Sequence, residues 1–117
     1  MTYAAFRDRF AEALDPRLYP IEYLDHLLTT GQAHFFATDK AAIVTEFKTF
    51  PTGAKAVRGL IAAGDLSTIE HTLIPRAEAW AKLHGCTFGM IDSRPGWAKR
   101  MNKHGYRVWQ VSLIKEL

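Results

Sequence analysis

The sequence predicts a mixed α/β (α+β) fold in which helices pack on a mixed sheet. Apolar residues recur at helical spacing at the start and in the middle of the 117-residue chain. Between these two regions lie three segments that are rich in aromatic and β-branched residues and are separated by short turns. A short apolar segment, a compact helical segment and a final strand-like segment follow. The expected element order is therefore α-α-β-β-β-α-β-α-β.

Two helices are expected at the N-terminus. Phe6, Phe10 and Leu14 recur every four residues, which is typical of the buried face of a helix. Pro20 is suited to open a second helix, because its fixed φ is compatible with a first turn. Gly31 is suited to end that helix, since glycine is favoured in the conformation that follows a last turn.

Three strands are expected next, at residues 34–38, 41–50 and 55–63. The first two flank Asp39-Lys40, which predicts a tight hairpin, and Pro51-Thr52-Gly53 predicts the following turn. Strands joined by such short turns pair antiparallel, so this region should form a meander.

A crossover helix should follow the meander. It is expected to begin near Leu66, to kink at Pro75, which removes one backbone hydrogen bond, and to end at Gly85. Residues 86–91 (CTFGMI) then predict a short buried strand. Because a helix connects it to the preceding strand, the two should run parallel and make the sheet mixed.

The C-terminal third contains a basic stretch, RPGWAKRMNKHGYRV, with five Lys or Arg residues and no acid. A helix at 96–103 and a final strand at 106–114 are expected here, with Trp97 and Met101 facing the core and the cations facing water. A nucleic-acid contact through these cations is the alternative interpretation. The net charge of only +3 makes that alternative the less favoured one.

Composition limits what the chain can be. Its length fits a single domain, with residues 1–31 as a helical N-terminal part and 34–117 as the core. The only cysteine, Cys86, excludes an internal disulfide, and no histidines stand at metal-ligand spacing, so we expect no metal site. No apolar run is long enough to span a membrane, and the first residues lack a secretory signal, so a cytoplasmic protein is expected.

Residues from about 34 to 117 resemble a known family. The pieces IVTEF, RGLIAAGDL, AEAWAKLHGC, RPGWAKRMNKHGYR and LIKEL look like small acetyltransferase-like proteins of bacteriophages and prophages. The element order resembles the core of the GCN5-related N-acetyltransferase (GNAT) superfamily. This resemblance implies acetyl-CoA as the cofactor, held between two splayed parallel strands, with its pyrophosphate on the N–H groups that begin the crossover helix.

Carried onto this chain, the resemblance places the splay between residues 58–62 and 87–91. The implied cofactor-binding residues are Leu60, Ile61, Ala62, Ala63, Gly64, Asp65, Leu66, Ser67 and Arg94. Three departures from the family pattern weaken the implied chemistry. The phosphate loop has Gly64 as its only glycine, and Asp65 as an N-cap would occupy donors and repel phosphate. Met101 stands where many members have a tyrosine that acts as general acid.

Two residues are candidates for acid–base chemistry. Glu46 is a candidate base, since many family members carry a carboxylate in the central strands; the alternative is a strand residue paired with Lys48 or Arg58. Tyr106 is a candidate acid if its hydroxyl points into the splay; the alternative is a ring packed at the sheet edge.

Arg94 follows a presumed parallel strand, where ligands of open sheets bind, and either contacts an anion or pairs with Asp92.

Three functions remain open from the sequence. The first is transfer of an acetyl group from acetyl-CoA to an unidentified amine. The second is a catalytically inactive GNAT-fold accessory or virion component that binds phage structural proteins, which would place it in a virion. The third is a weak nucleic-acid-binding module. An exposed edge at 106–114 would also allow a homodimer through the C-terminal strand.

Overall fold

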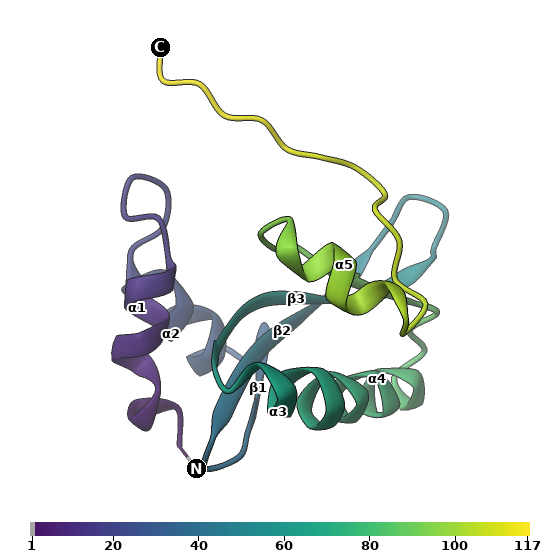
Figure 1. The fold of residues 1–117 in the computed structure, drawn as a ribbon, viewed down its shortest axis with the longest axis horizontal. Helices are drawn as coiled ribbons and strands as arrows, with labels where there is room; N and C mark the ends of the chain where they lie inside the picture. The colour runs from purple at the N-terminus through teal and green to yellow at the C-terminus, as the bar shows by residue number, and fades with distance from the viewer. Residues whose placement is uncertain (1) are drawn as a thin grey trace.

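The computed structural model describes residues 2–117 and contains a four-stranded mixed sheet with helices on both faces (Figure 1). The elements, in chain order, are a 3-10 turn at Tyr3–Ala5, α1 (Arg7–Ala13), α2 (Ile21–Thr29), β1 (Ala33–Ala37), β2 (Ala41–Thr49), β3 (Lys55–Gly64), α3 (Leu66–Thr68), a π-helical turn (Ile69–Leu73), α4 (Ile74–Leu83), β4 (Phe88–Ile91) and α5 (Gly96–Asn102). No helix within residues 2–117 is both long and apolar enough to cross a membrane.

The sheet has the order β1-β2-β3-β4, and the predicted topology is confirmed. β1, β2 and β3 pair antiparallel, and β3 pairs parallel to β4. The register of β2 against β3 shifts once, because Val44 lies opposite Ile61 whereas Thr45 lies opposite Gly59. Leu60 is therefore an extra residue on β3, a β-bulge that locally increases the twist of the strand.

Helices α1 and α2 cover one face of the sheet, as the spacing of Phe6 and Phe10 predicts. Both rings are buried with Leu24 and Leu27 of α2 against Val44 of β2. Polar contacts also join α2 to α1 and to the 3-10 turn before it: Arg7 Nη2 donates to Asp25 Oδ2 at 2.7 Å, and the Tyr3 hydroxyl donates to Asp25 Oδ1 at 2.6 Å.

The opposite face is covered by one long helix that runs through α3, the π turn and α4. Ile69, Leu73 and Ala77 pack on Ile43 of β2. The expected kink at Pro75 takes the form of the π turn, which ends one residue before α4 begins. A proline has no N–H to donate, and a wider turn beside it absorbs the missing bond.

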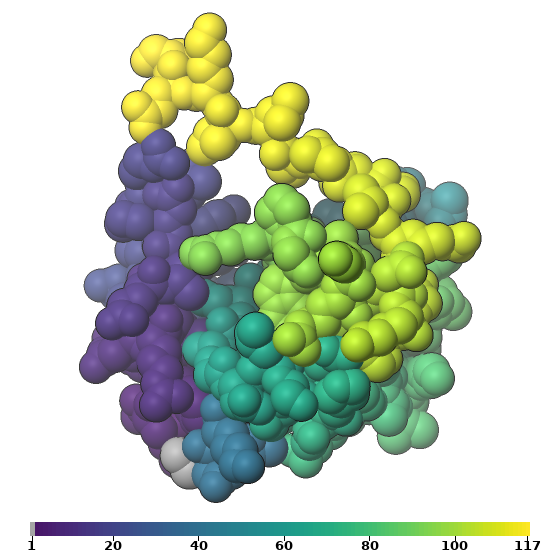
Figure 2. Space-filling view, in the orientation of Figure 1, coloured from purple at the N-terminus to yellow at the C-terminus, as the bar shows by residue number. Residues whose placement is uncertain are grey.

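The C-terminus differs from the sequence prediction. β4 begins at Phe88 rather than Cys86, and residues 106–117 form no strand, although a strand at 106–114 was expected. A strand needs a hydrogen-bonded neighbour, and after Gly105 the chain runs outward from the sheet (Figures 1 and 2). The order within residues 2–117 is therefore α-α-β-β-β-α-β-α.

Candidate functional site

The parallel ladder between β3 and β4 ends at Gly59. Ala56–Gly59 pair with Phe88–Ile91, and the last contact is from the Asp92 N–H to the Gly59 carbonyl at 3.5 Å. Beyond this point β3 continues for five residues, to Gly64, with no strand on that side in the part of the chain described. The strands thus diverge later than predicted, because residues 58 and 59 are still paired. The bulge at Leu60 is where β3 turns away.

Gly64 makes the turn from β3 into the crossover helix. Its φ is +105°, and a Cβ at this position would lie 2.3 Å from the Lys40 carbonyl oxygen and 2.7 Å from Ala41 Cα. The next N–H, that of Asp65, donates to the same Lys40 carbonyl at 3.1 Å. Only glycine fits both the conformation and the close approach. The contact with Lys40 and Ala41, in the hairpin between β1 and β2, therefore determines where the helix begins.

Asp65 caps this helix, as the sequence predicts. Its Oδ2 accepts from the Thr68 N–H at 2.8 Å and from the Thr68 hydroxyl at 2.7 Å. These bonds lower the pKa of Asp65. The cap satisfies one backbone donor, whereas the N–H groups of Leu66 and Ser67 have no acceptor among residues 2–117. Donors for an anion thus remain at this helix end, beside a negative charge.

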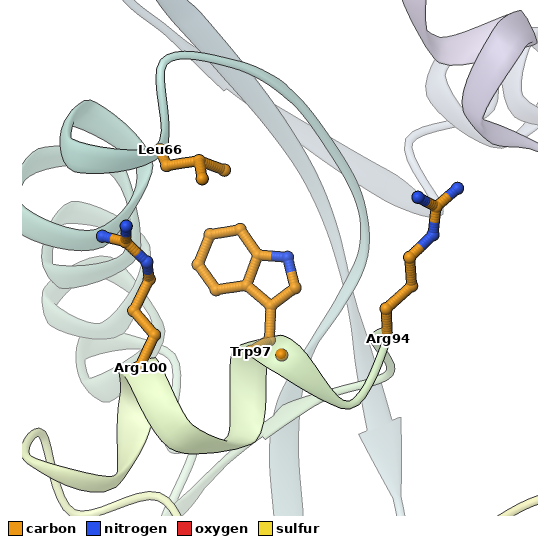
Figure 3. Close-up of a pocket in the computed structure, with 5 residues that line it drawn as sticks. Leu66, Arg94, Trp97 and Arg100 are labelled. Carbon is orange, nitrogen blue, oxygen red and sulfur yellow. The ribbon is translucent and has the colours of Figure 1, made fainter.

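A pocket of about 280 Å³ lies where the chain that leaves β4 faces the chain that leaves β3. Its lining consists of Leu66, Arg94, Gly96, Trp97 and Arg100. Figure 3 shows the indole of Trp97 between the two arginine side chains, with Leu66 across from it. Arg94 does not pair with Asp92, and its guanidinium has no carboxylate within ion-pair distance in the described chain. The pocket therefore combines an aromatic surface with a cation that is available to a ligand.

A buried carboxylate holds α5 in place beside the pocket. The side chain of Glu70, in the π turn, is fully buried; it accepts from Arg100 at 2.5 Å and from His104 at 2.6 Å. His71 at 3.2 Å and Lys103 at 3.6 Å complete the cluster. The hydrogen bond from His104, followed by that from Arg100, lowers the pKa of Glu70 to about 2. The cluster holds the Arg100 side chain in one position, and Arg100 forms part of the lining of the pocket.

The same cluster contains three potential metal ligands that the sequence did not bring together. Ligand atoms of Glu70, His71 and His104 lie within 4.8 Å of one another. The prediction of no metal site considered spacing along the chain, which does not reveal this arrangement. Arg100 and Lys103 already balance the carboxylate, however, and two nearby cations oppose a divalent ion. The geometry supports a role in positioning α5.

Glu46 forms an ion pair with Arg58, which is the alternative that the sequence left open. Arg58 Nε donates to Glu46 Oε1 at 2.9 Å, and Asp92 Oδ2 lies 3.7 Å from the same nitrogen. Asp92 is the more accessible carboxylate, with 64% of its side chain exposed against 19% for Glu46. Asp92 also stands at the end of the ladder. The sequence signal for it was an acid directly after a parallel strand, a position where ligands of open sheets bind.

Tyr106 lies on the other face of the sheet. Its hydroxyl donates to Glu78 Oε2 on α4 at 2.6 Å and sits over Gly89, where a Cβ would be 2.6 Å from the oxygen. Burial, and then the carboxylate of Glu78, raise the pKa of Tyr106. Tyr106 and Thr45 line one small cavity of about 30 Å³. Because Glu46 follows Thr45 on β2 and points to the opposite face, the structure does not bring Glu46 and Tyr106 together.

The remaining predicted cofactor residues lie on β3 beyond the ladder. The side chains of Leu60, Ile61 and Ala63 pack against the α1–α2 cluster, and Ala62 packs against the cluster that includes Trp97. These side chains belong to the core. Any contact that residues 60–63 make with a ligand is therefore through the backbone edge that β4 leaves uncovered.

Comparison with known proteins identifies the fold. The sequence matches no protein-family model and no curated protein sequence. Solved acetyltransferase structures do match. The aminoglycoside 6′-N-acetyltransferase AAC(6′)-Ig from Acinetobacter haemolyticus has a TM-score of 0.68 at 17% identity, over 100% of this chain and 96% of that one. The ribosomal-protein-alanine N-acetyltransferase from Brucella melitensis biovar Abortus 2308 has a TM-score of 0.67 at 16% identity, over 97% and 91%.

A third similar structure is a predicted acetyltransferase from Clostridium acetobutylicum with acetyl-CoA, at a TM-score of 0.66 and 15% identity over 96% of this chain and 86% of that one. These neighbours are GNAT acetyltransferases, and the four-stranded mixed sheet with its helices has the GNAT-like fold that the sequence predicted.

Proposed function

We propose that the protein binds acetyl-CoA and transfers its acetyl group to an amine. The observation that carries the proposal is the arrangement at the end of the β3–β4 ladder. The strands part after Gly59, and a pocket of about 280 Å³ lies where their continuations face each other. The pocket contains the guanidinium of Arg94, which pairs with no carboxylate of residues 2–117. The shared fold supports the same reading, since its similar structures include acetyltransferases for different acceptors.

The residues around the pocket fit the nucleotide part of acetyl-CoA. Arg94 and the free N–H groups of Leu66 and Ser67 are suitable donors to phosphate oxygens. Trp97 offers an aromatic surface on which a base would stack. Asp65 is the one opposing feature, because its negative charge at the same helix end would weaken phosphate binding.

Bound acetyl-CoA would supply an activated acyl group. The backbone of Leu60 and Ile61 lies beyond the ladder, and an N–H group there would stabilise negative charge on an acyl oxygen. Asp92, the exposed carboxylate at the ladder end, would accept a proton from the acceptor amine. Glu46 and Tyr106 remain predicted base and acid. Each is now held by a partner that it would have to release in order to act.

The binding step is tested by isothermal titration calorimetry with acetyl-CoA. Replacing Arg94 by alanine should weaken binding about tenfold or more, because hydrogen bonds to charged groups contribute roughly 1.5–3 kcal/mol. Lys99→Ala is the matched control, since Lys99 is a cation on α5, close to Arg94 in the sequence, and does not line the pocket. Equal affinity of the two variants, or no binding by the native chain, would reject the proposed site.

The transfer step is tested by release of the coenzyme A thiol. A peptide with an N-terminal alanine and an aminoglycoside represent the acceptors that the names of two similar structures specify. If thiol release depends on the acceptor and its rate is lower in the Asp92→Asn variant, the result would support acetyl transfer with Asp92 as the base. If thiol release is the same with and without each amine, the result would contradict acetyl transfer.

A GNAT-fold protein without transfer activity is the second candidate. The observation that favours it is that both predicted acid–base residues are engaged, Glu46 by Arg58 and Tyr106 by Glu78. Such a protein would bind acetyl-CoA, or a partner protein, without turnover. The bacteriophage or prophage origin, with structural proteins as partners, stays a prediction of the sequence. Binding in the calorimeter without thiol release would favour this candidate.

A further inference from the structure

A small cavity lies beside the point where β3 and β4 part. Its volume is about 30 Å³, and residues of β2, β3, β4 and α4 line it together with Tyr106. Gly59 and Ile91, the last pair of the parallel ladder, are both in its lining. The cavity therefore borders the gap at which the acyl group of a bound acyl-CoA would lie. It shares no lining residue with the pocket of about 280 Å³ beside α5.

The missing side chain of Gly59 gives the cavity its space. Thr45 of β2 pairs with Gly59, and Gly59 pairs with Ile91 of β4, so these three residues lie in one row across the sheet. Residues directly opposite one another in a sheet point to the same face. Thr45 and Ile91 thus stand on either side of a position where β3 carries no side chain. A Cβ on Gly59 would meet only the Met90 carbonyl oxygen within 4 Å, at an ordinary contact distance of 3.8 Å.

Most of the lining is apolar, and the polar groups are few. Ile74 and Ala77 of α4 line the helix side. The Glu78 carboxylate already accepts from the Tyr106 hydroxyl. The Thr45 hydroxyl, at the β2 end, is buried and has no hydrogen-bond partner within residues 2–117. An alkyl chain that reached this hydroxyl would leave it without a partner, which is unfavourable for a buried polar group. The lining therefore suits a short alkyl group and opposes a long one.

The volume of the cavity limits how much of an acyl chain it can hold. A cavity of roughly 10–15 Å³ holds one water-sized group. A volume of about 30 Å³ therefore holds about two such groups, and a methyl or methylene group is close to water in size. An acetyl group has one carbon beyond its carbonyl, a propionyl group has two and a butyryl group has three. Acetyl and propionyl groups fit by this measure, and a butyryl group is too long.

We infer that this cavity receives the alkyl end of the acyl group and limits the acyl donor to acetyl-CoA and propionyl-CoA. The inference rests on the proposed function, in which the acyl carbonyl lies at the backbone of Leu60 and Ile61 beyond the ladder. The alkyl end then lies beneath Gly59, on the α4 side of the sheet, while the carbonyl stays at the gap where an acceptor amine would meet it. Gly59 and Ile74 determine the length of acyl chain that the protein accepts.

Isothermal titration calorimetry with coenzyme A and its acetyl, propionyl, butyryl and hexanoyl thioesters tests the inference. Coenzyme A without an acyl group is the reference for each variant, so the quantity compared is the Kd of a thioester divided by the Kd of coenzyme A. In the native chain the acetyl and propionyl ratios should agree within about threefold, and butyryl-CoA should bind about tenfold more weakly or worse, because one methylene in an apolar pocket changes affinity roughly 10–200-fold. Hexanoyl-CoA should bind no better than butyryl-CoA.

Two variants change the cavity in opposite directions. Gly59→Ala adds a methyl group to it, so propionyl-CoA should lose about tenfold in affinity relative to acetyl-CoA. Ile74→Ala removes part of the helix-side lining, so butyryl-CoA should gain about tenfold relative to acetyl-CoA. Ile21→Ala is the matched control, since Ile21 is also a partly buried isoleucine but packs on the α1–α2 cluster and does not line the cavity. Circular dichroism verifies the fold of each variant, and either cavity variant alone suffices for the test.

The outcomes separate this inference from the proposed function. If the native chain binds neither coenzyme A nor any thioester, both fail. If the thioesters bind with equal ratios, or if the two cavity variants change the ratios no more than Ile21→Ala does, binding of acyl-CoA stands and the cavity does not receive the acyl group. A cavity that holds only water would give this second result.

Discussion

Replacing Gly64 by alanine tests the geometry that sets the start of the crossover helix. The glycine has φ +105°, which a residue with a side chain rarely adopts. The added methyl would lie 2.3 Å from the Lys40 carbonyl oxygen and 2.7 Å from Ala41 Cα, both backbone atoms that cannot rotate aside. The β2 hairpin and the turn after β3 would have to move apart.

The expected cost combines two contributions. Holding a non-glycine residue at this φ costs about 1–3 kcal/mol. Relieving the contact with Lys40 also strains the hydrogen bond from the Asp65 N–H to the Lys40 carbonyl, now 3.1 Å, which is worth about 1 kcal/mol. We therefore expect Gly64→Ala to lower the free energy of unfolding by about 3 kcal/mol. For a domain of this size the melting temperature should fall by roughly 10 °C.

Gly53→Ala is the matched control. Gly53 also has a positive φ, +89°, but a Cβ there would meet nothing within 4 Å. It should therefore carry the conformational cost alone, about 1–2 kcal/mol. Both variants are measured by urea unfolding followed by circular dichroism. If Gly64→Ala and Gly53→Ala lose the same stability, the close approach to Lys40 is not the reason for the glycine.

Three further variants, with one exposed control, test the packing and the polar contacts. Glu70 has a pKa of about 2 in the folded chain against an ordinary 4.5. Its contribution to the free energy of unfolding is therefore complete above pH 4.5 and is lost as the pH falls toward 2. Glu70→Gln should make the free energy of unfolding depend less on pH over that range. Tyr106→Phe should cost about 1–2 kcal/mol in urea unfolding, because Glu78 loses a half-buried donor, and an unchanged midpoint would contradict the contact. Phe10→Ala, at a fully buried ring, should cost about 3–5 kcal/mol, whereas exposed Leu18→Ala should stay within about 0.5 kcal/mol.

Much of the fold followed from local sequence signals. The helical spacing of Phe6 and Phe10, the hairpin at Asp39-Lys40 and the cap at Asp65 each concern residues that are close together in the chain. Such signals act through backbone propensity and side-chain periodicity, which a sequence shows directly. The crossover rule then made β3 and β4 parallel without further information.

Two kinds of structural feature could not be predicted from local sequence signals: the pairing partner of a strand and the contacts between residues far apart in the chain. The alternating pattern of 106–114 indicates a strand, but it does not state which edge the strand pairs with, and in residues 2–117 this segment pairs with none. Contacts between distant residues were also invisible: Glu70 meets Arg100 and Glu78 meets Tyr106 only because α5 folds back over the crossover helix. The same holds for Asp92: pairing with Arg94 was one of the two alternatives left open for that arginine, and the Asp92 carboxylate lies instead beside Arg58.

The central claim, that a cofactor binds between the start of α3 and α5, is tested most directly by titrating the ¹⁵N-labelled protein with acetyl-CoA and following its amide and indole resonances. The largest shifts should fall on the N–H groups of Leu66 and Ser67 and on the indole of Trp97, because these groups are free at the helix end or line the pocket. Saturating acetyl-CoA that leaves these three resonances unmoved, or that moves only resonances of residues 107–117, would contradict the account.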